Sequence, residues 1–233
     1  MTIQDNTELA SASRLSAQVA ELQRFYGLLP LPPTEPFALF AWEVLSRKAL
    51  PASRDAAMAN LRKAHVLTPD AVVRAPRATL EAALAPAGSL ELRLDALRAG
   101  AETFRRNRNL PATIRGRLNP ARRSLRLLGQ LDAAGVHRML LFGGDHPIVP
   151  ADPRLFRVAA RLGYVSAEKR VVRSARHELG VLLGNDPHVL RRAVVYLTHH
   201  GSLTCTDREP HCRVCPLASE CPASDSSTGS ASP

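Results

Sequence analysis

The sequence has few aromatic side chains and almost no lysine. Phe, Trp and Tyr make up 4% of its 233 residues, and lysine occurs only at Lys48, Lys63 and Lys169, although the formal net charge is +10. The positive charge is therefore carried almost entirely by arginine. A basic excess of this size favours a polyanionic partner, most often nucleic acid. Alternatively, the positive charge serves only solubility and reflects an arginine-rich composition.

Long apolar runs are absent as well. No stretch is long and apolar enough to span a bilayer, and the first residues lack the charged-then-apolar pattern of a signal peptide. The basic residues do not gather on one amphipathic helix, which argues against binding to a membrane surface. We therefore expect a cytoplasmic protein, associated with the nucleoid in a bacterium, in which disulfide bonds are disfavoured.

Alternating strand patterns and internal repeats are also missing, whereas Ala, Leu and Arg, which favour helices, are abundant. Apolar residues recur on one helical face at Leu15, Val19, Leu22 and Tyr26. Three further helix starts combine an N-cap residue with proline, at Asn119-Pro120, Asp152-Pro153 and Asp186-Pro187. The sequence predicts an all-α protein of about ten short helices joined by short loops.

All cysteines lie in the short segment CTDREPHCRVCPLASEC, at Cys205, Cys212, Cys215 and Cys221. In a cytoplasmic protein such a group indicates a metal site before disulfides. Zinc ribbons use two C-x2-C pairs, and only one is present here. A cubic iron–sulfur cluster tolerates unequal gaps better, because each sulfur binds a different iron. From the residues alone, iron–sulfur and zinc both remain open, with disulfides as a third alternative.

The C-x6-C-x2-C-x5-C spacing resembles the cluster loop of the endonuclease III family of DNA glycosylases, in the helix-hairpin-helix superfamily. The family motif that leads into this loop is L-x-x-H-G-x-x-x-C. It is matched by Leu197, His200, Gly201 and Cys205. The resemblance implies that the four cysteines ligate a 4Fe–4S cluster.

The segment PIVPADPRLFRVAARLGYV (147–165) is similar to the family segment around the active-site aspartate. Asp152 matches that aspartate, and Arg157 and Arg161 follow in step with the family pattern. In this family a flipped-out nucleotide enters a cleft and its glycosidic bond is cut. The resemblance implies that Asp152 stabilises positive charge on the sugar and activates the attacking nucleophile. An Asp before Pro is also an ordinary N-cap, and the two roles are compatible.

The resemblance further implies two helical lobes, a helical barrel that carries a degenerate helix-hairpin-helix and an iron–sulfur cluster domain. Applied to this sequence, it divides the chain into a flexible N-terminus (1–12), an N-terminal helix and linker that join the cluster domain (13–36), the helical barrel (37–146), the cluster domain (147–223) and a disordered tail (224–233).

The hairpin departs from the family pattern L-P-G-x-G-x-K-T-A. In the stretch LGQLDAAGVHRMLLF the two glycine positions fall on Gln130 and Asp132, and the lysine position falls on Ala134. That lysine is the Schiff-base nucleophile of members with lyase activity. We therefore expect weak or absent lyase activity and weakened phosphate binding. Asp132 either repels a phosphate or caps the next helix.

Four basic residues are expected to contact DNA. Lys48 takes the place of a glutamine that wedges into DNA in the family, Arg154 follows Asp152, and Arg208 and Arg213 lie in the cysteine loop. The plain alternative for each is a solvated surface residue.

The sequence thus predicts a base-excision repair glycosylase of the endonuclease III type, acting as a monomer on double-stranded DNA with a flipped-out lesion. The alternative from another functional class is a non-catalytic iron–sulfur protein that recognises distorted or damaged DNA. A third alternative is a basic helical protein that is stabilised by a zinc site and is unrelated to DNA repair.

Overall fold

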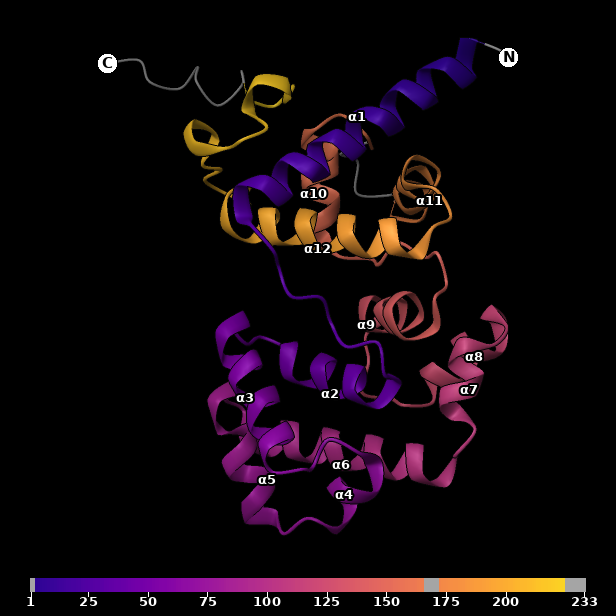
Figure 1. Ribbon diagram of the computed structural model, residues 1–233, viewed down its shortest axis with the longest axis vertical. Coiled ribbons are helices and arrows are strands. Elements are labelled where there is room, and N and C mark those ends of the chain that lie inside the picture. Colours follow the sequence, from indigo (N-terminus) through magenta and orange to yellow (C-terminus); the bar gives the residue numbers. More distant parts are fainter. Residues whose placement is uncertain (1–2, 166–171, 225–233) are drawn as a thin grey trace. The chain divides into compact units, whose positions relative to one another are not determined.

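The computed structural model describes residues 3–165 and 172–224 (Figure 1). These residues form helices joined by loops and include no β-strand, which confirms the all-α prediction. No helix in this part of the chain is long and apolar enough to cross a membrane. The chain packs as two compact units, which we call the terminal unit (residues 1–31 and 147–233) and the central unit (residues 32–146).

The terminal unit combines the first helix of the chain with the last ones. Its helices are α1 (Ile3–Tyr26), α10 (Pro153–Arg161), α11 (Val172–Leu183), α12 (Pro187–Leu203) and the short 3-10 helices η3 (Cys212–Val214) and η4 (Ala218–Glu220). Helix α12 packs against both α1 and α10. Leu15, Val19 and Leu22 of α1 are buried, as the helical spacing predicted.

The helix α1 is longer than expected. It begins at Ile3, so most of the segment 1–12 that we expected to be flexible is helical. No proline or glycine interrupts the sequence between Ile3 and Tyr26, and a helix can therefore continue across the polar residues. The predicted disordered tail (224–233) lies outside the described residues except for Ser224, and Lys169 lies outside them as well.

Helices α10 and α12 approach each other closely at Gly201. A Cβ atom at this position would lie 2.9 Å from the carbonyl oxygen of Arg154 and 3.1 Å from Cγ2 of Val158. A side chain would therefore force the two helices apart. This contact explains the glycine that follows His200 in the sequence motif, because it brings the start of the cysteine loop against α10.

The central unit is built from the middle helices of the chain. They are α2 (Pro36–Ser46), α3 (Pro51–Lys63), α4 (Pro69–Arg74), α5 (Arg77–Leu84), η1 (Ala85–Ala87), α6 (Leu90–Arg106), α7 (Leu110–Arg115), α8 (Leu118–Arg126), α9 (Ala133–Arg138) and the π-helical turn η2 (Met139–Gly143). Phe37 and Phe40 of α2 pack with Phe104 of α6, with ring centroids 5.3 to 6.2 Å apart. This aromatic cluster forms part of the buried core.

Two of the three predicted Asp-Pro or Asn-Pro helix starts are confirmed. Asp152 and Asp186 each cap a helix by accepting the backbone N–H two residues further on. The prediction at Asn119 is wrong, because α8 begins at Leu118, two residues before Pro120, and its N-cap is Arg117. Pro120 therefore lies in the first turn of α8, where no helical hydrogen bond needs its missing N–H.

Candidate functional site

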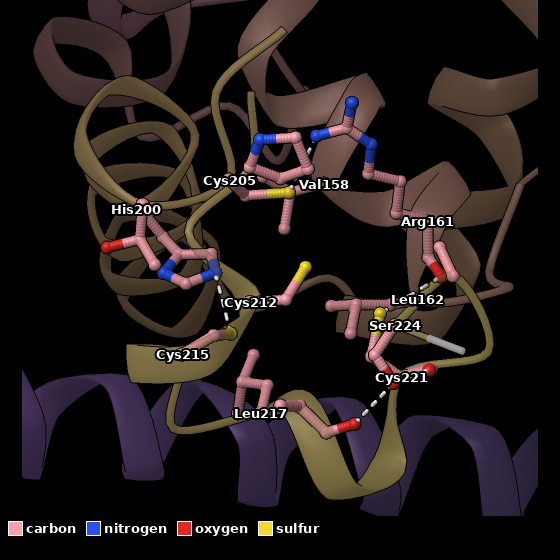
Figure 2. A pocket seen from close by; sticks show the side chains of 14 residues that line it. Val158, Arg161, Leu162, His200, Cys205, Cys212, Cys215, Leu217, Cys221 and Ser224 are labelled. Carbon is pink, nitrogen blue, oxygen red and sulfur yellow. Dashed lines mark hydrogen bonds between the residues drawn. The ribbon is translucent and has the colours of Figure 1, made fainter. Parts of the chain in front are cut away.

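The four cysteines line one pocket in the terminal unit (Figure 2). Cys205 follows the end of α12, and the other three cysteines come from the loop with η3 and η4. The other walls are largely apolar and include Val158, Leu162 and Leu217. All four cysteines are free, and the four thiols share one partly buried space.

Burial raises the pKa of the Cys215 thiol and that of the Cys221 thiol above the usual range. Charge on the neighbouring cysteines raises both pKa values further, while backbone N–H groups from Leu217 and Ala223 oppose the shift. The pocket therefore disfavours several thiolates together unless a positively charged group compensates them. Metal or cluster iron supplies such a charge.

In the part of the chain that the structure describes, no group of three or more His, Cys, Asp or Glu side chains could hold a metal ion. The donor set is four thiols, and both zinc and a 4Fe–4S cluster are bound by four cysteine thiolates. Since each sulfur of a cubic cluster binds a different iron, four cysteines with unequal gaps in the sequence fit such a cluster.

Two arginines of α10 hold the cysteine loop. Arg161 donates from Nη1 to Sγ of Cys205 at 3.3 Å and to the carbonyl oxygen of Thr206 at 2.5 Å. Arg157 donates from Nε to the carbonyl oxygen of Cys205 at 3.1 Å and from Nη2 to that of Gly201 at 2.5 Å. Both arginines matched the family segment in sequence, and their contacts give that match a physical reason.

A buried histidine links the pocket to α1. The His200 ring lies with Nε2 3.6 Å from Sγ of Cys215 and Nδ1 2.8 Å from the hydroxyl of Tyr26. The Tyr26 hydroxyl also lies 2.6 Å from Oγ1 of Thr204. Burial, with a smaller effect of His199, lowers the pKa of His200 to about 4. In the sequence, Tyr26 is distinguished only by its position as the last residue of an apolar helical face, which does not indicate a contact with His200.

Asp152 is 4% exposed and caps α10. Its Oδ1 accepts the backbone N–H of Arg154 at 2.9 Å. The guanidinium of Arg154 also binds it, with Nη2 2.8 Å from Oδ2, and reaches Oγ of Ser202 at 3.2 Å. The capping role is confirmed. The Arg154 side chain, which we predicted to contact DNA, is engaged with the carboxylate next to it.

The hairpin between α8 and α9 contains one glycine in a left-handed conformation, Gly129, with φ of +63°. Asp132 caps α9, and its Oδ1 accepts the backbone N–H of Gly135 at 2.6 Å, so the predicted cap is confirmed. Ala134 lies on α9. Arg47 Nη1 donates to the carbonyl oxygen of Gln130 at 3.2 Å and so ties the end of α2 to the hairpin.

Lys48 lies just beyond α2, exposed, with φ of +55°. This left-handed backbone is strained for any residue other than glycine. Arg93, which is 3% exposed, supports the turn by donating to the carbonyl oxygens of Val44 at 2.5 Å and Arg47 at 2.6 Å. Nε of Arg93 donates to the carbonyl oxygen of Gly88 at 2.7 Å. Neither helical spacing nor a motif indicated that this arginine is buried.

The two remaining predicted DNA contacts, Arg208 and Arg213, are exposed on the cysteine loop. Arg213 lies in η3, directly after Cys212. The structure therefore brings these two arginines and the four cysteines together on one short segment, while Lys48 belongs to the central unit.

No protein-family model matches this chain, and none of the curated proteins matches it. Solved structures do. The chain is 17% identical to endonuclease III in a non-covalent complex with DNA, with a TM-score of 0.71, covering 93% of this chain and 98% of that chain.

Two further structures give similar values. A trapped covalent intermediate of endonuclease III with DNA, an estranged-adenine complex, has 17% identity and a TM-score of 0.70. A thermostable thymine-DNA glycosylase has 14% identity and a TM-score of 0.69. Both comparisons cover 93% of this chain and 98% of the other. The chain thus has the all-α fold of endonuclease III-like glycosylases.

Proposed function

We propose that this protein is a DNA glycosylase of the endonuclease III type, which cleaves the N-glycosidic bond of a damaged or mismatched base in double-stranded DNA. The observation that carries the proposal is the similarity of the fold to DNA-bound endonuclease III over 93% of the chain. The net charge of +10 supports it, because cationic side chains release counterions from DNA phosphates. We propose a monomer that works in the cytoplasm on a flipped-out base.

Asp152 is the carboxylate that we propose for the reaction. Water attacks C1′ of the flipped-out nucleotide, and the bond from C1′ to the base nitrogen breaks with its electron pair leaving on the base. A carboxylate beside the sugar stabilises the positive charge of the transition state and accepts the proton that the water loses. The bonds from the backbone and side chain of Arg154 hold this carboxylate in one orientation.

The reaction that we propose stops at base release. The lyase route needs an amine that forms a Schiff base with the sugar, and the matching position on α9 is Ala134, whose methyl group cannot do this. Lys48 and Lys63 are the lysines within the described residues. We propose that water, rather than a lysine, is the nucleophile.

We also propose that Cys205, Cys212, Cys215 and Cys221 hold a 4Fe–4S cluster. When bound, the cluster supplies covalent cross-links and a one-electron centre. The chain's own residues do the positioning: Arg157 and Arg161 fix the loop on α10, and the loop presents Arg208 and Arg213 to solvent, where they bind DNA phosphates. Iron and sulfide analysis with visible absorption tests this, because zinc thiolates are colourless.

A second function has one specific observation in its favour. Asp152 is 4% exposed, and both of its carboxylate oxygens are contacted by Arg154. A carboxylate occupied in this way fits a structural role in a protein that binds distorted or damaged DNA without cutting it. The loss of two hairpin glycines at Gln130 and Asp132 points in the same direction.

The deciding experiment is base release from lesion-bearing duplexes, read with and without alkali, by the purified wild type and by Asp152→Asn. Asparagine still caps a helix but removes the charge. Asp186→Asn is the matched control, since Asp186 is also an Asp-Pro cap that accepts a backbone N–H two residues on. We expect strand breaks only after alkali, a loss of 100-fold or more in Asp152→Asn, on the order expected for an acid–base residue, and normal activity in the control.

Two outcomes contradict the proposal. No base release on any duplex by a protein that binds DNA favours the non-catalytic alternative. Strand breaks without alkali contradict the hydrolytic mechanism and require another amine.

A further inference from the structure

One hydrogen-bonded chain connects α1 to the thiol pocket. It runs from Oγ1 of Thr204 to the hydroxyl of Tyr26 (2.6 Å), on to Nδ1 of His200 (2.8 Å), and from Nε2 of the same ring to Sγ of Cys215 (3.6 Å). Figure 2 shows the contact between the His200 ring and the sulfur of Cys215 as a dashed line. All four residues belong to the terminal unit, so the chain lies within one packed body.

The direction of each hydrogen bond follows from the ligand role of Cys215. A thiolate bound to iron has no proton and acts as an acceptor, so Nε2 of His200 must carry the hydrogen in this contact. In the neutral imidazole Nδ1 is then an acceptor. Tyr26 must therefore donate its hydroxyl proton to Nδ1, and Thr204 donates to the Tyr26 oxygen. The tyrosine hydroxyl selects the tautomer that points N–H at the sulfur.

We infer that Tyr26 is a positioning residue for the cluster: its hydroxyl fixes His200 in the tautomer that donates to the Cys215 ligand and thereby raises the cluster's reduction potential. This inference rests on the proposed 4Fe–4S cluster. It makes the electronic properties of the cluster depend on α1, a helix far from the cysteine loop in sequence.

The sign of the effect follows from charge. Reduction adds one electron and makes the cluster and its thiolates more negative, and an N–H aimed at a ligand sulfur stabilises that extra charge. The His200 ring is 2% exposed, and a hydrogen bond is stronger in such a place than in water. Without the Tyr26 hydroxyl, the ring can hold its hydrogen on Nδ1 instead, and the donor to Cys215 is lost.

The hydroxyl can be removed without removing the ring. The ring of Tyr26 packs edge-on against His199, with centroids 4.7 Å apart, and against Phe25, at 4.9 Å. Phenylalanine keeps these contacts, so Tyr26→Phe tests the hydrogen bond rather than the packing of α1.

Tyr196 offers a matched control in the same unit. Its hydroxyl also makes two hydrogen bonds, donating to the carbonyl oxygen of Gly27 at 2.7 Å and accepting from the backbone N–H of Leu29 at 3.2 Å. None of these partners is a cysteine or His200. Tyr196→Phe therefore removes an equivalent hydroxyl that joins α12 to the segment after α1, without touching the chain to Cys215.

The experiment is a redox titration, followed by electron paramagnetic resonance, of the full-length, cluster-loaded wild type, Tyr26→Phe and Tyr196→Phe. We expect Tyr26→Phe to lower the ratio of reduced to oxidised cluster about tenfold at a fixed potential, which is 59 mV for one electron, and Tyr196→Phe to match the wild type. Equal potentials in all three proteins, or equal shifts in both variants, overturn the inference.

A second measurement keeps the test independent of the variants. In wild-type protein with ¹⁵N-labelled histidine, the two ring nitrogen shifts of His200 report the tautomer, and we expect the hydrogen on Nε2. A hydrogen on Nδ1 overturns the inference. Wild-type protein that contains no iron overturns the cluster proposal itself, and the inference with it, whereas iron-loaded protein with unchanged potentials overturns the inference alone.

Discussion

Arg154 contacts both carboxylate oxygens of Asp152 from only two positions further along the chain, with Nη2 2.8 Å from Oδ2 and Nε 3.1 Å from Oδ1. The backbone N–H of the same arginine donates to Oδ1 at 2.9 Å. Asp152 therefore caps α10 whatever chemistry it performs. Its cap and its proposed catalytic role can be tested separately, because asparagine replaces the cap but not the charge.

The first prediction concerns the cap alone. We expect Asp152→Ala to lower the free energy of unfolding by about 1 kcal/mol more than Asp152→Asn does, because only alanine removes the acceptor for the first turn of α10. The ion pair with Arg154 adds little to either loss, since the arginine side chain is 49% exposed. Urea unfolding of the two variants measures the difference. Equal midpoints would mean that the cap does not stabilise the helix.

The second prediction concerns DNA binding by the cysteine loop. If exposed Arg213 binds a phosphate, Arg213→Ser reduces the slope of log Kd against log salt concentration by about 0.9, the value for one released counterion. Arg77→Ser is the control, because Arg77 is already paired with Glu81 and Glu91. Fluorescence anisotropy at several salt concentrations measures both slopes. An unchanged slope in Arg213→Ser removes this residue from the DNA contacts.

The third prediction concerns the aromatic core of the central unit. A Cβ atom at Gly100 would lie 2.1 Å from Cε1 and Cζ of Phe40, so Gly100→Ala forces the ring to move and costs about 1–3 kcal/mol. Gly180 of α11 has nothing within 4 Å of its Cβ position, so Gly180→Ala stabilises its helix by about 0.5–1 kcal/mol. Thermal unfolding compares the two. A gain of stability in both variants contradicts the packing at Phe40.

The cysteine pocket could be predicted because its four ligand candidates are of one rare type and lie close together in the sequence. The residues around it could not. Tyr26 and His200 are 174 positions apart, and neither helical spacing nor composition relates them. A motif match placed Arg157 and Arg161 in step with the family, but only the packing of α10 against α12 shows that they bind the loop's carbonyl groups.

Backbone conformation was the other feature that the sequence did not reveal. Helical spacing and cap residues predicted the elements, and Asp152 and Asp186 begin helices as expected. The left-handed turn at Lys48 depends on a buried arginine from another helix, Arg93. Local propensity disfavours such a turn for lysine, so tertiary contacts must impose it.

A buried ion pair in the central unit gives a prediction that depends on pH. Arg138 binds Glu43 with Nε 2.7 Å from Oε1 and Nη2 2.8 Å from Oε2, and the Glu43 side chain is only 3% exposed. Burial raises the pKa of Glu43 above its usual value of 4.5, while the charge of Arg138 opposes that rise. Arg138→Met leaves the carboxylate without this partner, which typically costs about 3–5 kcal/mol.

The cost should depend on pH in a defined direction. The pKa of Glu43 is raised in the folded state above its unfolded-state value of 4.5. Below pH 4.5 the side chain is neutral in both states and does not destabilise the fold. Stability is then lost as the pH rises through the folded-state pKa, where the buried carboxylate ionises. We therefore expect Arg138→Met to be destabilised little near pH 4 and fully at pH 7, in urea titrations across that interval. The double variant Glu43→Gln, Arg138→Met has no carboxylate to ionise and should lose this pH dependence. A single variant whose loss is the same at both pH values would mean that Glu43 does not ionise inside the fold, and that the pair is held by neutral hydrogen bonds.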